Sequence, residues 1–247
     1  MSKIILENLA HKLEQLSGKE QLLALRDFLQ ETENNNQLKA TLLSAFNPED
    51  ILLSDFLREL NFPLPIFFLD TKKHFPETLR YVDEIKSRCE IQDLRVLTPD
   101  EQQLNRLDPE GNMWQSQVNR CCYLRKVAPL EAALQQGGFN ILITGRRGDQ
   151  TPERQNIGTI EWDEKGRLKL NPLIHMQKNE RDENLKLRHL PLHPLYNLGY
   201  PSIGCAPCTT PVFAGEDDRA GRWRHTRLND HQQKTECGLH VAIKEAE

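Results

Sequence analysis

The chain has 247 residues, a net charge of −4 and a pI near 6.1, and 38% of its residues are hydrophobic. This composition suits one α/β domain of generous size, or one domain with a terminal appendage. The acidic balance provides no global positive field, so neither nucleic acid nor an anionic membrane is expected as a partner. An anionic ligand must therefore be held by local arginines.

No stretch of the sequence approaches the ~20 apolar residues that a membrane span requires. The start, MSKIILENLAHKLEQL, lacks the basic beginning, apolar centre and small-residue cleavage site of a secretory signal. We therefore expect a cytoplasmic protein. In that compartment, six cysteines favour metal binding or redox chemistry over a disulfide framework.

The first 34 residues predict two amphipathic helices, because leucine and isoleucine recur there at helical spacing. The polar run ETENNNQ at 31–37 indicates a linker. We expect a helical segment at 1–36, an α/β domain at 37–200 and an irregular functional segment at 201–247, which is rich in Gly, Pro, Cys and charge.

Short apolar runs alternate with helical patterns through the central part of the chain. Strands are expected at 41–46, 65–70, 94–98 and 139–145, with a β-hairpin at 158–172. Asn47 is a good N-cap and Pro48 a good first residue for the helix after the first strand. Pro99 is expected at the first position of a later helix, within a capping box. The alternation predicts an α/β fold, a mostly parallel sheet with helices on both faces.

Ligands of such sheets bind at the carboxyl ends of the strands. Three polar segments lie there: SAFNPED (44–50), LDT (69–71) and TGRRGDQ (144–150).

Four cysteines form two pairs, Cys121–Cys122 and Cys205–Cys208. A lone CxxC also fits zinc and thioredoxin-like sites, and free cysteines are often simply buried. An adjacent pair is an awkward half-site for tetrahedral zinc, whereas a cubane cluster spreads four thiolates over four irons. Cys89 has no partner in the sequence and is expected to pack in the core.

Five segments together carry a resemblance to one enzyme family. They are CCYLRKVAPL (121–130), ITGRRGDQTP (143–152), GYPSIGCAPCT (199–209), DDRAGRW (217–223) and ECGLH (236–240). Over about residues 40–240 the chain resembles the cluster-containing adenylyl-sulfate reductases of the phosphoadenylyl-sulfate reductase family. The resemblance implies a sheet of the adenine-nucleotide alpha hydrolase-like (PP-loop) type. It also implies reduction of adenylyl sulfate to sulfite and AMP in sulfate assimilation, with thioredoxin or a similar thiol as the reductant.

The same resemblance implies a 4Fe–4S cluster held by Cys121, Cys122, Cys205 and Cys208. Lys126 would lie close enough to influence it electrostatically.

Cys237, in ECGLH, is the implied nucleophile. Its thiolate would attack the sulfate sulfur and expel AMP, and a second thiol would then release sulfite from the S-sulfonated cysteine. His240 is expected to be merely solvated.

Sulfate and phosphate require fixed positive charge, which arginine supplies as a planar fork. Arg147, Arg219 and Arg222 match the family's anion-binding positions. Most other basic residues, Lys186 and Arg188 among them, are expected to be solvated.

Two turns match the family's nucleotide-binding positions. The matching residues are Ser44, Glu49, Asp50, Leu69, Asp70 and Thr71. The first turn departs from the family at Asn47, where a small residue such as glycine is usual, and at Pro48, which lacks an N–H donor. Asparagine tolerates a positive φ, but it can instead cap the helix. A second departure is the segment 174–191, which is highly charged where the family has a tryptophan-containing helix.

Two rival interpretations remain at this point. One is a nucleotide-dependent sulfurtransferase, in which the CxxC pair would serve sulfur transfer. The other is a degenerate, non-enzymatic family member with a structural or redox-sensing cluster. The sequence is compatible with a homo-oligomer.

Overall fold

The computed structural model describes residues 2–31 and 38–225. The expected linker at 31–37 falls almost wholly outside these residues, as do Cys237 and His240. The chain forms two compact units, which are described separately. Unit 1 comprises Met1–Phe68, Tyr81–Arg95 and Gly137–Leu192, and unit 2 comprises Leu69–Arg80, Val96–Gln136 and His193–Glu247. The division of the chain at 36/37 and 200/201 stays a prediction.

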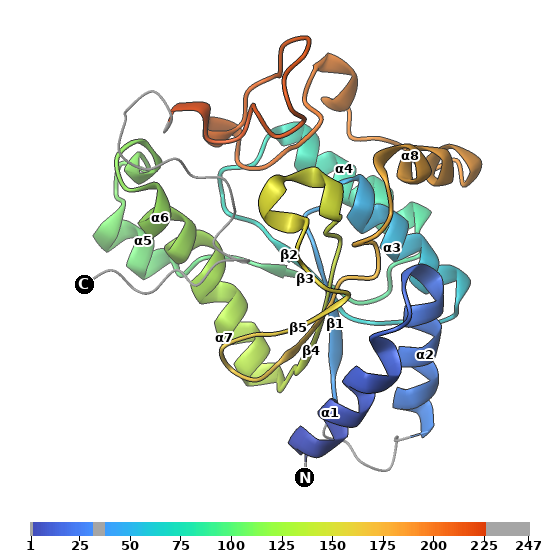
Figure 1. Cartoon of the computed structure of the whole chain (residues 1–247). Helices are drawn as coiled ribbons and strands as arrows, with labels where there is room; N and C mark the ends of the chain where they lie inside the picture. Colours follow the sequence, from blue (N-terminus) through green and yellow to red (C-terminus); the bar gives the residue numbers. More distant parts are fainter. Residues whose placement is uncertain (1, 32–37, 226–247) are drawn as a thin grey trace. The chain divides into compact units, whose positions relative to one another are not determined.

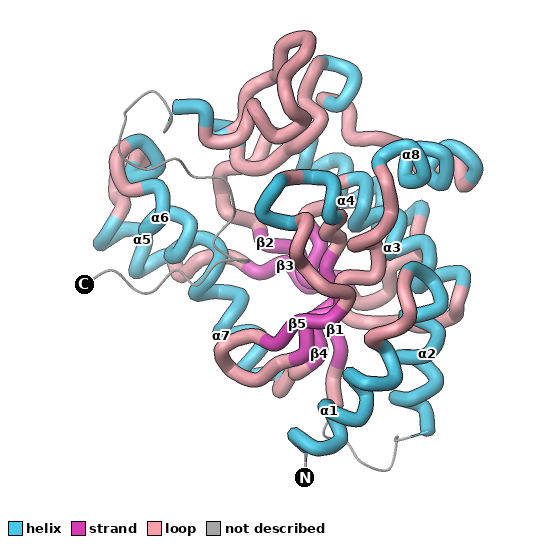
Figure 2. Tube along the Cα trace, viewed as in Figure 1, coloured by secondary structure: helices cyan, strands magenta, loops and turns pink. Residues whose placement is uncertain are grey.

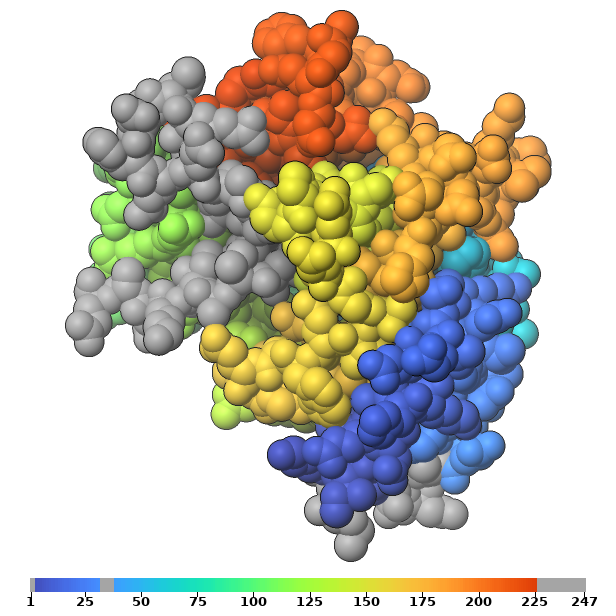
Figure 3. Space-filling model, viewed as in Figure 1, coloured from blue at the N-terminus to red at the C-terminus, as the bar shows by residue number. Residues whose placement is uncertain are grey.

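Unit 1 begins with a helical hairpin, α1 (Ser2–Leu13) and α2 (Gly18–Glu31), as the leucine spacing predicts. Leu9, Leu13, Leu22 and Leu25 are fully buried because they share the inward faces of the two helices. Two hydrogen bonds join the turn between the helices to the segment 158–172. The Thr159 hydroxyl donates to the Glu14 carbonyl, and the Gly18 N–H donates to the Pro172 carbonyl. Figure 3 shows this seam, where the blue hairpin adjoins the yellow segment.

The sheet has six strands in the order β3-β2-β1-β4-β6-β5. Figure 1 labels β1 to β5 within it. The strands are β1 (Ala40–Ser44), β2 (Ile66–Leu69), β3 (Leu94–Leu97), β4 (Ile141–Thr144), β5 (Ile160–Trp162) and β6 (Leu168–Leu170). β1 pairs in parallel with β2 and β4, and β4 pairs in parallel with β6. β5 and β6 form the expected antiparallel hairpin. All four residues of β4 are buried, as a parallel strand covered on both faces requires. The predicted mostly parallel sheet is confirmed.

Helices α3 (Pro48–Glu59) and α8 (Lys178–Leu187) lie side by side in unit 1. Arg188, at the end of α8, joins them by ion pairs with Asp55 (2.9 Å) and Glu59 (2.7 Å), and it also stacks on the Phe56 ring. The expectation that Arg188 is solvated was therefore wrong. The buried Asp55 carboxylate provides the reason, since a buried charge needs a partner. Lys186 is exposed, as expected.

Helix α4 (Pro76–Arg88) contributes to both units. In unit 2, α5 (Glu101–Leu107) is capped by Asp100, whose side chain accepts the Gln103 N–H at 2.8 Å. Pro99 therefore precedes the helix, and its predicted place as the first helical residue was wrong. Aspartate is the stronger N-cap, so the helix begins one residue after it.

A continuous helical run in unit 2 contains α6 (Val118–Cys122), a π-helical stretch (Tyr123–Val127) and α7 (Ala128–Gly137). After α8, the described chain is mostly loop, as Figure 2 shows. None of the helices in the described residues combines the length and apolar character that a membrane span needs.

Candidate functional site

The first predicted nucleotide turn joins β1 to α3 in unit 1. The Asp50 carboxylate accepts the N–H groups of Ala45 (2.8 Å) and Asn47 (3.2 Å), which folds the loop over the start of α3. Asn47 is extended (φ −72°) and occupies the N-cap position, so of its two expected roles the structure selects capping. The positive φ of this loop (55°) belongs instead to Phe46.

Ser44 and Asp50 are both buried in this turn. The Ser44 hydroxyl accepts the Phe46 N–H at 3.1 Å. Burial raises the pKa of the Asp50 carboxyl to about 7, and the charge of Glu49 acts in the same direction, against the loop N–H donors. Gly145 packs directly against Asp50, where an added Cβ would lie 3.1 Å from the Asp50 nitrogen. A larger residue at 145 would therefore push the β4 end away from the α3 start.

Arg147 follows β4 in the same unit and is almost fully buried. Its Nε donates to Glu49 Oε1 at 2.8 Å, and its Nη1 pairs with Asp149. Arg181, from α8, donates to the same Glu49 oxygen at 2.7 Å. The structure thus brings Arg147 and Glu49 together, as expected, and adds Arg181. Sequence reasoning missed Arg181 because an arginine among acidic helical residues carries no distinctive signal.

The second predicted turn, Leu69–Thr71, belongs to unit 2. Asp70 accepts the Lys72 N–H and its ammonium group, both at 2.9 Å, and Lys72 takes a positive φ of 59°. Thr71 is fully buried, and its hydroxyl lies 3.2 Å from Cys205 Sγ. This turn therefore directly contacts one of the paired cysteines.

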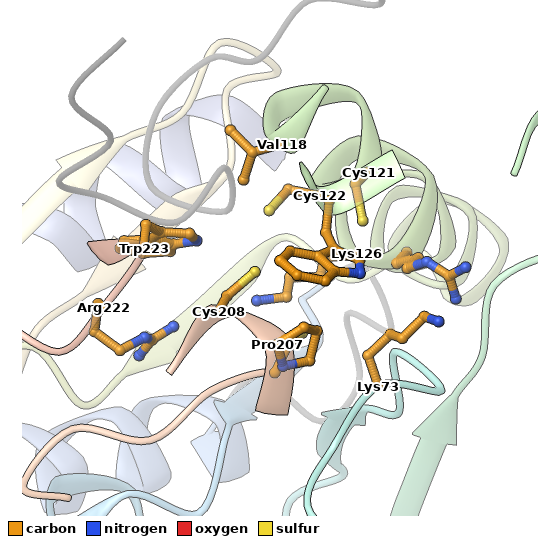
Figure 4. Close-up of a pocket in the computed structure, with 12 residues that line it drawn as sticks. Lys73, Val118, Cys121, Cys122, Lys126, Pro207, Cys208, Arg222 and Trp223 are labelled. Carbon is orange, nitrogen blue, oxygen red and sulfur yellow. The ribbon is translucent and has the colours of Figure 1, made fainter. Parts of the chain in front are cut away.

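The four paired cysteines line one pocket of unit 2. Cys121 and Cys122 come from α6, whereas Cys205 caps a short helical turn, Ala206–Cys208, whose last residue is Cys208. Figure 4 shows the side chains of Cys121, Cys122 and Cys208 around this pocket, together with Lys126. Lys126 lies on the π-helical stretch, a feature frequent at functional sites. The structure thus brings the two cysteine pairs and Lys126 together around one pocket, and their role as cluster ligands stays a prediction.

Burial raises the pKa of the Cys121 thiol to about 11 and that of Cys208 to about 12. A positive group is therefore needed to hold these sulfurs as thiolates. Within residues 2–31 and 38–225, no group of three or more His, Cys, Asp or Glu side chains is arranged to hold a metal ion.

Two arginines around the pocket have buried donors. Arg125 donates to the Thr71 carbonyl (3.0 Å) and forms a buried ion pair with Asp108 (2.7 Å). Arg222 stacks on Trp223, with its guanidinium carbon 4.6 Å from the ring centroid. The Nε atoms of Arg125 and Arg222 are buried without a hydrogen-bond partner in the described part of the chain. Such donors fit a pocket that accommodates an anionic group.

Arg219, the third predicted anion-binding arginine, is partly exposed. Its guanidinium carbon lies 5.8 Å from the Trp223 ring centroid. Cys89 lies elsewhere, buried in the core of unit 1, which confirms its expected packing role. The catalytic and binding roles assigned to individual residues remain predictions.

Residues 39–211 match the family model of the phosphoadenosine phosphosulfate reductase domain. This chain belongs to the phosphoadenosine phosphosulfate reductase family. An adenosine 5'-phosphosulfate reductase of Staphylococcus haemolyticus is 40% identical over 204 residues, covering 81% of this chain and 80% of that protein. The phosphoadenosine 5'-phosphosulfate reductase of Gloeobacter violaceus is 41% identical and covers 82% and 83%. The predicted family is confirmed.

The fold agrees with that of the phosphoadenylyl-sulfate reductase of Candida auris, solved as a phosphate complex. That structure superposes with a TM-score of 0.66 at 24% identity and covers 83% of this chain and 95% of that one. The family match ends at residue 211, before Arg219, Arg222 and Cys237.

Proposed function

We propose that this protein reduces adenylyl sulfate to sulfite and AMP, with thioredoxin or a similar dithiol as the reductant, in cytoplasmic sulfate assimilation. The observation that carries the proposal is the four-cysteine pocket, in which Cys205 Sγ lies within hydrogen-bonding distance (3.2 Å) of the hydroxyl of Thr71, a residue of the predicted nucleotide-binding turn. Family membership makes the protein an oxidoreductase that acts on the sulfur of a sulfonucleotide. The relatives' names include both adenylyl and phosphoadenylyl substrates, so the choice between them is part of the proposal.

In the proposed reaction, the electrons that reduce the sulfate group to sulfite come from the thiols of Cys237 and of the dithiol reductant. The Cys237 thiolate attacks the sulfate sulfur, the bond from sulfur to the AMP phosphate oxygen breaks, and an S-sulfocysteine forms. One thiolate of the reductant then attacks Cys237 Sγ, so that sulfite leaves with the electron pair and a mixed disulfide remains. The second thiol of the reductant resolves that disulfide and regenerates Cys237.

Arginines hold the anionic substrate in this scheme. Arg147, at the end of β4 in unit 1, is proposed to contact the sulfonucleotide. For Arg219 and Arg222, the anion-binding role stays the one that the family resemblance implies. Donors that stay buried and fixed stabilise charge that develops on the leaving phosphate, because they need no reorganisation during the reaction.

In number and ligand type, the four pocket thiols suit a proposed 4Fe–4S cluster. Lys126 and the buried Nε donors of Arg125 and Arg222 would offset the negative charge of that cluster and its thiolates. When bound, the cluster would cross-link the segments 121–122 and 205–208 and set the local electrostatic potential. Lys126 and Arg125 would contribute by fixing the charge around the pocket and by anchoring the Thr71 turn.

The deciding experiment measures sulfite release by anaerobically purified protein with reduced thioredoxin. The two substrates are adenylyl sulfate and its 3′-phosphorylated analogue. We expect turnover of both to be detectable and kcat/KM to favour adenylyl sulfate. A clear preference for the phosphorylated substrate contradicts the substrate assignment. No turnover of either, together with no AMP binding, favours the degenerate, non-enzymatic member.

The cluster has a separate test in iron and acid-labile sulfide content. Cys208→Ser should lose both, whereas Cys89→Ala, a matched change at a buried cysteine outside the pocket, should retain them. Stoichiometric zinc without sulfide in the wild-type protein would rule out the cluster.

A further inference from the structure

Helix α8 carries a buried arginine. Arg181 is only 3% exposed, and its guanidinium donates to Glu49 Oε1 at 2.7 Å. The same oxygen accepts Arg147 Nε at 2.8 Å. One carboxylate is therefore shared by two buried guanidinium groups, one of which is the predicted anion ligand.

The start of α8 touches the second carboxylate that holds Arg147. Asp149 pairs with Arg147 Nη1, and its other oxygen accepts the Lys178 N–H at 2.9 Å. Each acidic partner of Arg147 is thus also bound by α8. Helix α8 and Arg147 therefore share both carboxylates.

The charges show what Arg181 contributes. Arg147 carries one positive charge and contacts two carboxylates, those of Glu49 and Asp149, so these three groups alone have one negative charge in excess. Arg181 supplies the missing positive charge. Its second partner, Asp182, has a side chain 45% exposed, so water screens that carboxylate far more than the buried groups. Without Arg181, the charges of Arg147, Glu49 and Asp149 would together repel a phosphate or sulfate group. With Arg181 these four groups are neutral, and the neighbouring Asp50, whose pKa burial raises to about 7, adds less than a full negative charge, so Arg147 can attract the anion.

We propose that Arg181 is a positioning residue for sulfonucleotide binding. It neutralises Glu49 and thereby enables Arg147 to accept the anionic part of the substrate. The inference rests on the proposed function, since it requires that Arg147 binds the sulfonucleotide. Arg181 itself need not touch the ligand.

A matched control exists on the same helix pair. Arg188 also joins α8 to acidic residues of α3, at Asp55 and Glu59, but these lie beyond the first turn of α3. A purely structural role for Arg181 predicts that Arg181→Met and Arg188→Met behave alike. Neither change leaves a buried carboxylate without an ion-pair partner. Glu49 still pairs with Arg147 in Arg181→Met, and Asp55 still pairs with Arg58 in Arg188→Met.

The test measures AMP affinity by calorimetry, and KM and kcat for adenylyl sulfate, in Arg181→Met, Arg181→Lys and Arg188→Met. We expect Arg181→Met to weaken AMP binding and raise KM roughly tenfold, the order expected for one nearby charge in a partly buried site, with kcat nearly unchanged. Arg181→Lys should recover most of the loss, and Arg188→Met should leave KM at the wild-type value.

A second variant tests the charge balance directly. Adding Asp149→Asn to Arg181→Met removes the excess negative charge and should restore much of the affinity. An unchanged KM in Arg181→Met, or an equal rise in Arg188→Met, overturns the inference. If Arg181→Met does not fold, a wild-type KM in Arg181→Gln overturns it. Wild-type protein that does not bind AMP overturns the nucleotide site itself, which distinguishes that failure from this one.

Discussion

Phe46 combines two opposing contributions to stability at the turn that precedes α3. Its backbone is left-handed (φ 55°), which costs about 1–2 kcal/mol for a residue with a Cβ. Its ring is 1% exposed and packs edge-on against Phe68, with the centroids 5.6 Å apart. Phe46→Ala should therefore destabilise the fold by about 3–5 kcal/mol, because it removes a buried ring and retains the strained backbone.

Phe46→Gly removes the same ring but also relieves the backbone. Relief of the left-handed strain stabilises the glycine variant by about 1–2 kcal/mol. The greater chain entropy of glycine in the unfolded state destabilises it by about 0.4–1 kcal/mol. The glycine variant should consequently be more stable than the alanine variant by about 0.5–1 kcal/mol. The free energy of unfolding, measured by anaerobic urea titration, gives this difference directly.

Phe68 provides the matched control, since it is equally buried but lies on β2 with extended backbone. There glycine should be worse than alanine by about 0.5–1 kcal/mol. If glycine is no better than alanine at position 46, or if the order is the same at both positions, the backbone of Phe46 is not strained and the reasoning fails.

Three further predictions concern other parts of the chain. Burial lowers the pKa of His193 from 6.5 to about 4, so neutral His193 contributes up to about 3 kcal/mol of stability above pH 6.5, which is lost as the pH falls towards 4. Between pH 7 and 5, urea titrations should show a smaller loss of unfolding free energy in His193→Gln than in the wild type, and an equal loss would contradict the assignment. Gly145→Ala should weaken AMP binding and cost about 1–3 kcal/mol, because its Cβ collides with the Asp50 carboxylate; calorimetry and urea titration measure both, and an unaffected variant refutes the close packing. Cys237→Ser should abolish sulfite release while the iron content stays at the wild-type level, and mass spectrometry of wild-type protein without reductant should find the sulfite adduct on Cys237; an active serine variant rules out the mechanism.

Local patterns in the sequence determined most of the secondary structure and the family. The buried apolar runs that became β1, β2 and β4 differ in periodicity from the amphipathic helices between them, and that contrast is intrinsic to the chain. The Asn47–Pro48 pair likewise specified the start of α3, because a capping residue and a proline act through local geometry. The paired cysteines predicted a shared site, since four thiols with this spacing have few other uses.

Tertiary structure decided the features that depend on distant partners. The pairing of Arg181 with Glu49 joins residues 132 positions apart, and nothing near either of them in the sequence predicts it. The same is true of Arg188, whose buried partner Asp55 attracts a charge that the local pattern assigned to solvent. The left-handed conformation at Phe46, rather than at Asn47, was also decided by packing, because burial of the ring outweighs the local preference for a smaller residue. Charge pairing and burial are properties of the folded surroundings, and for this reason only the folded chain could show which arginines pair with buried carboxylates.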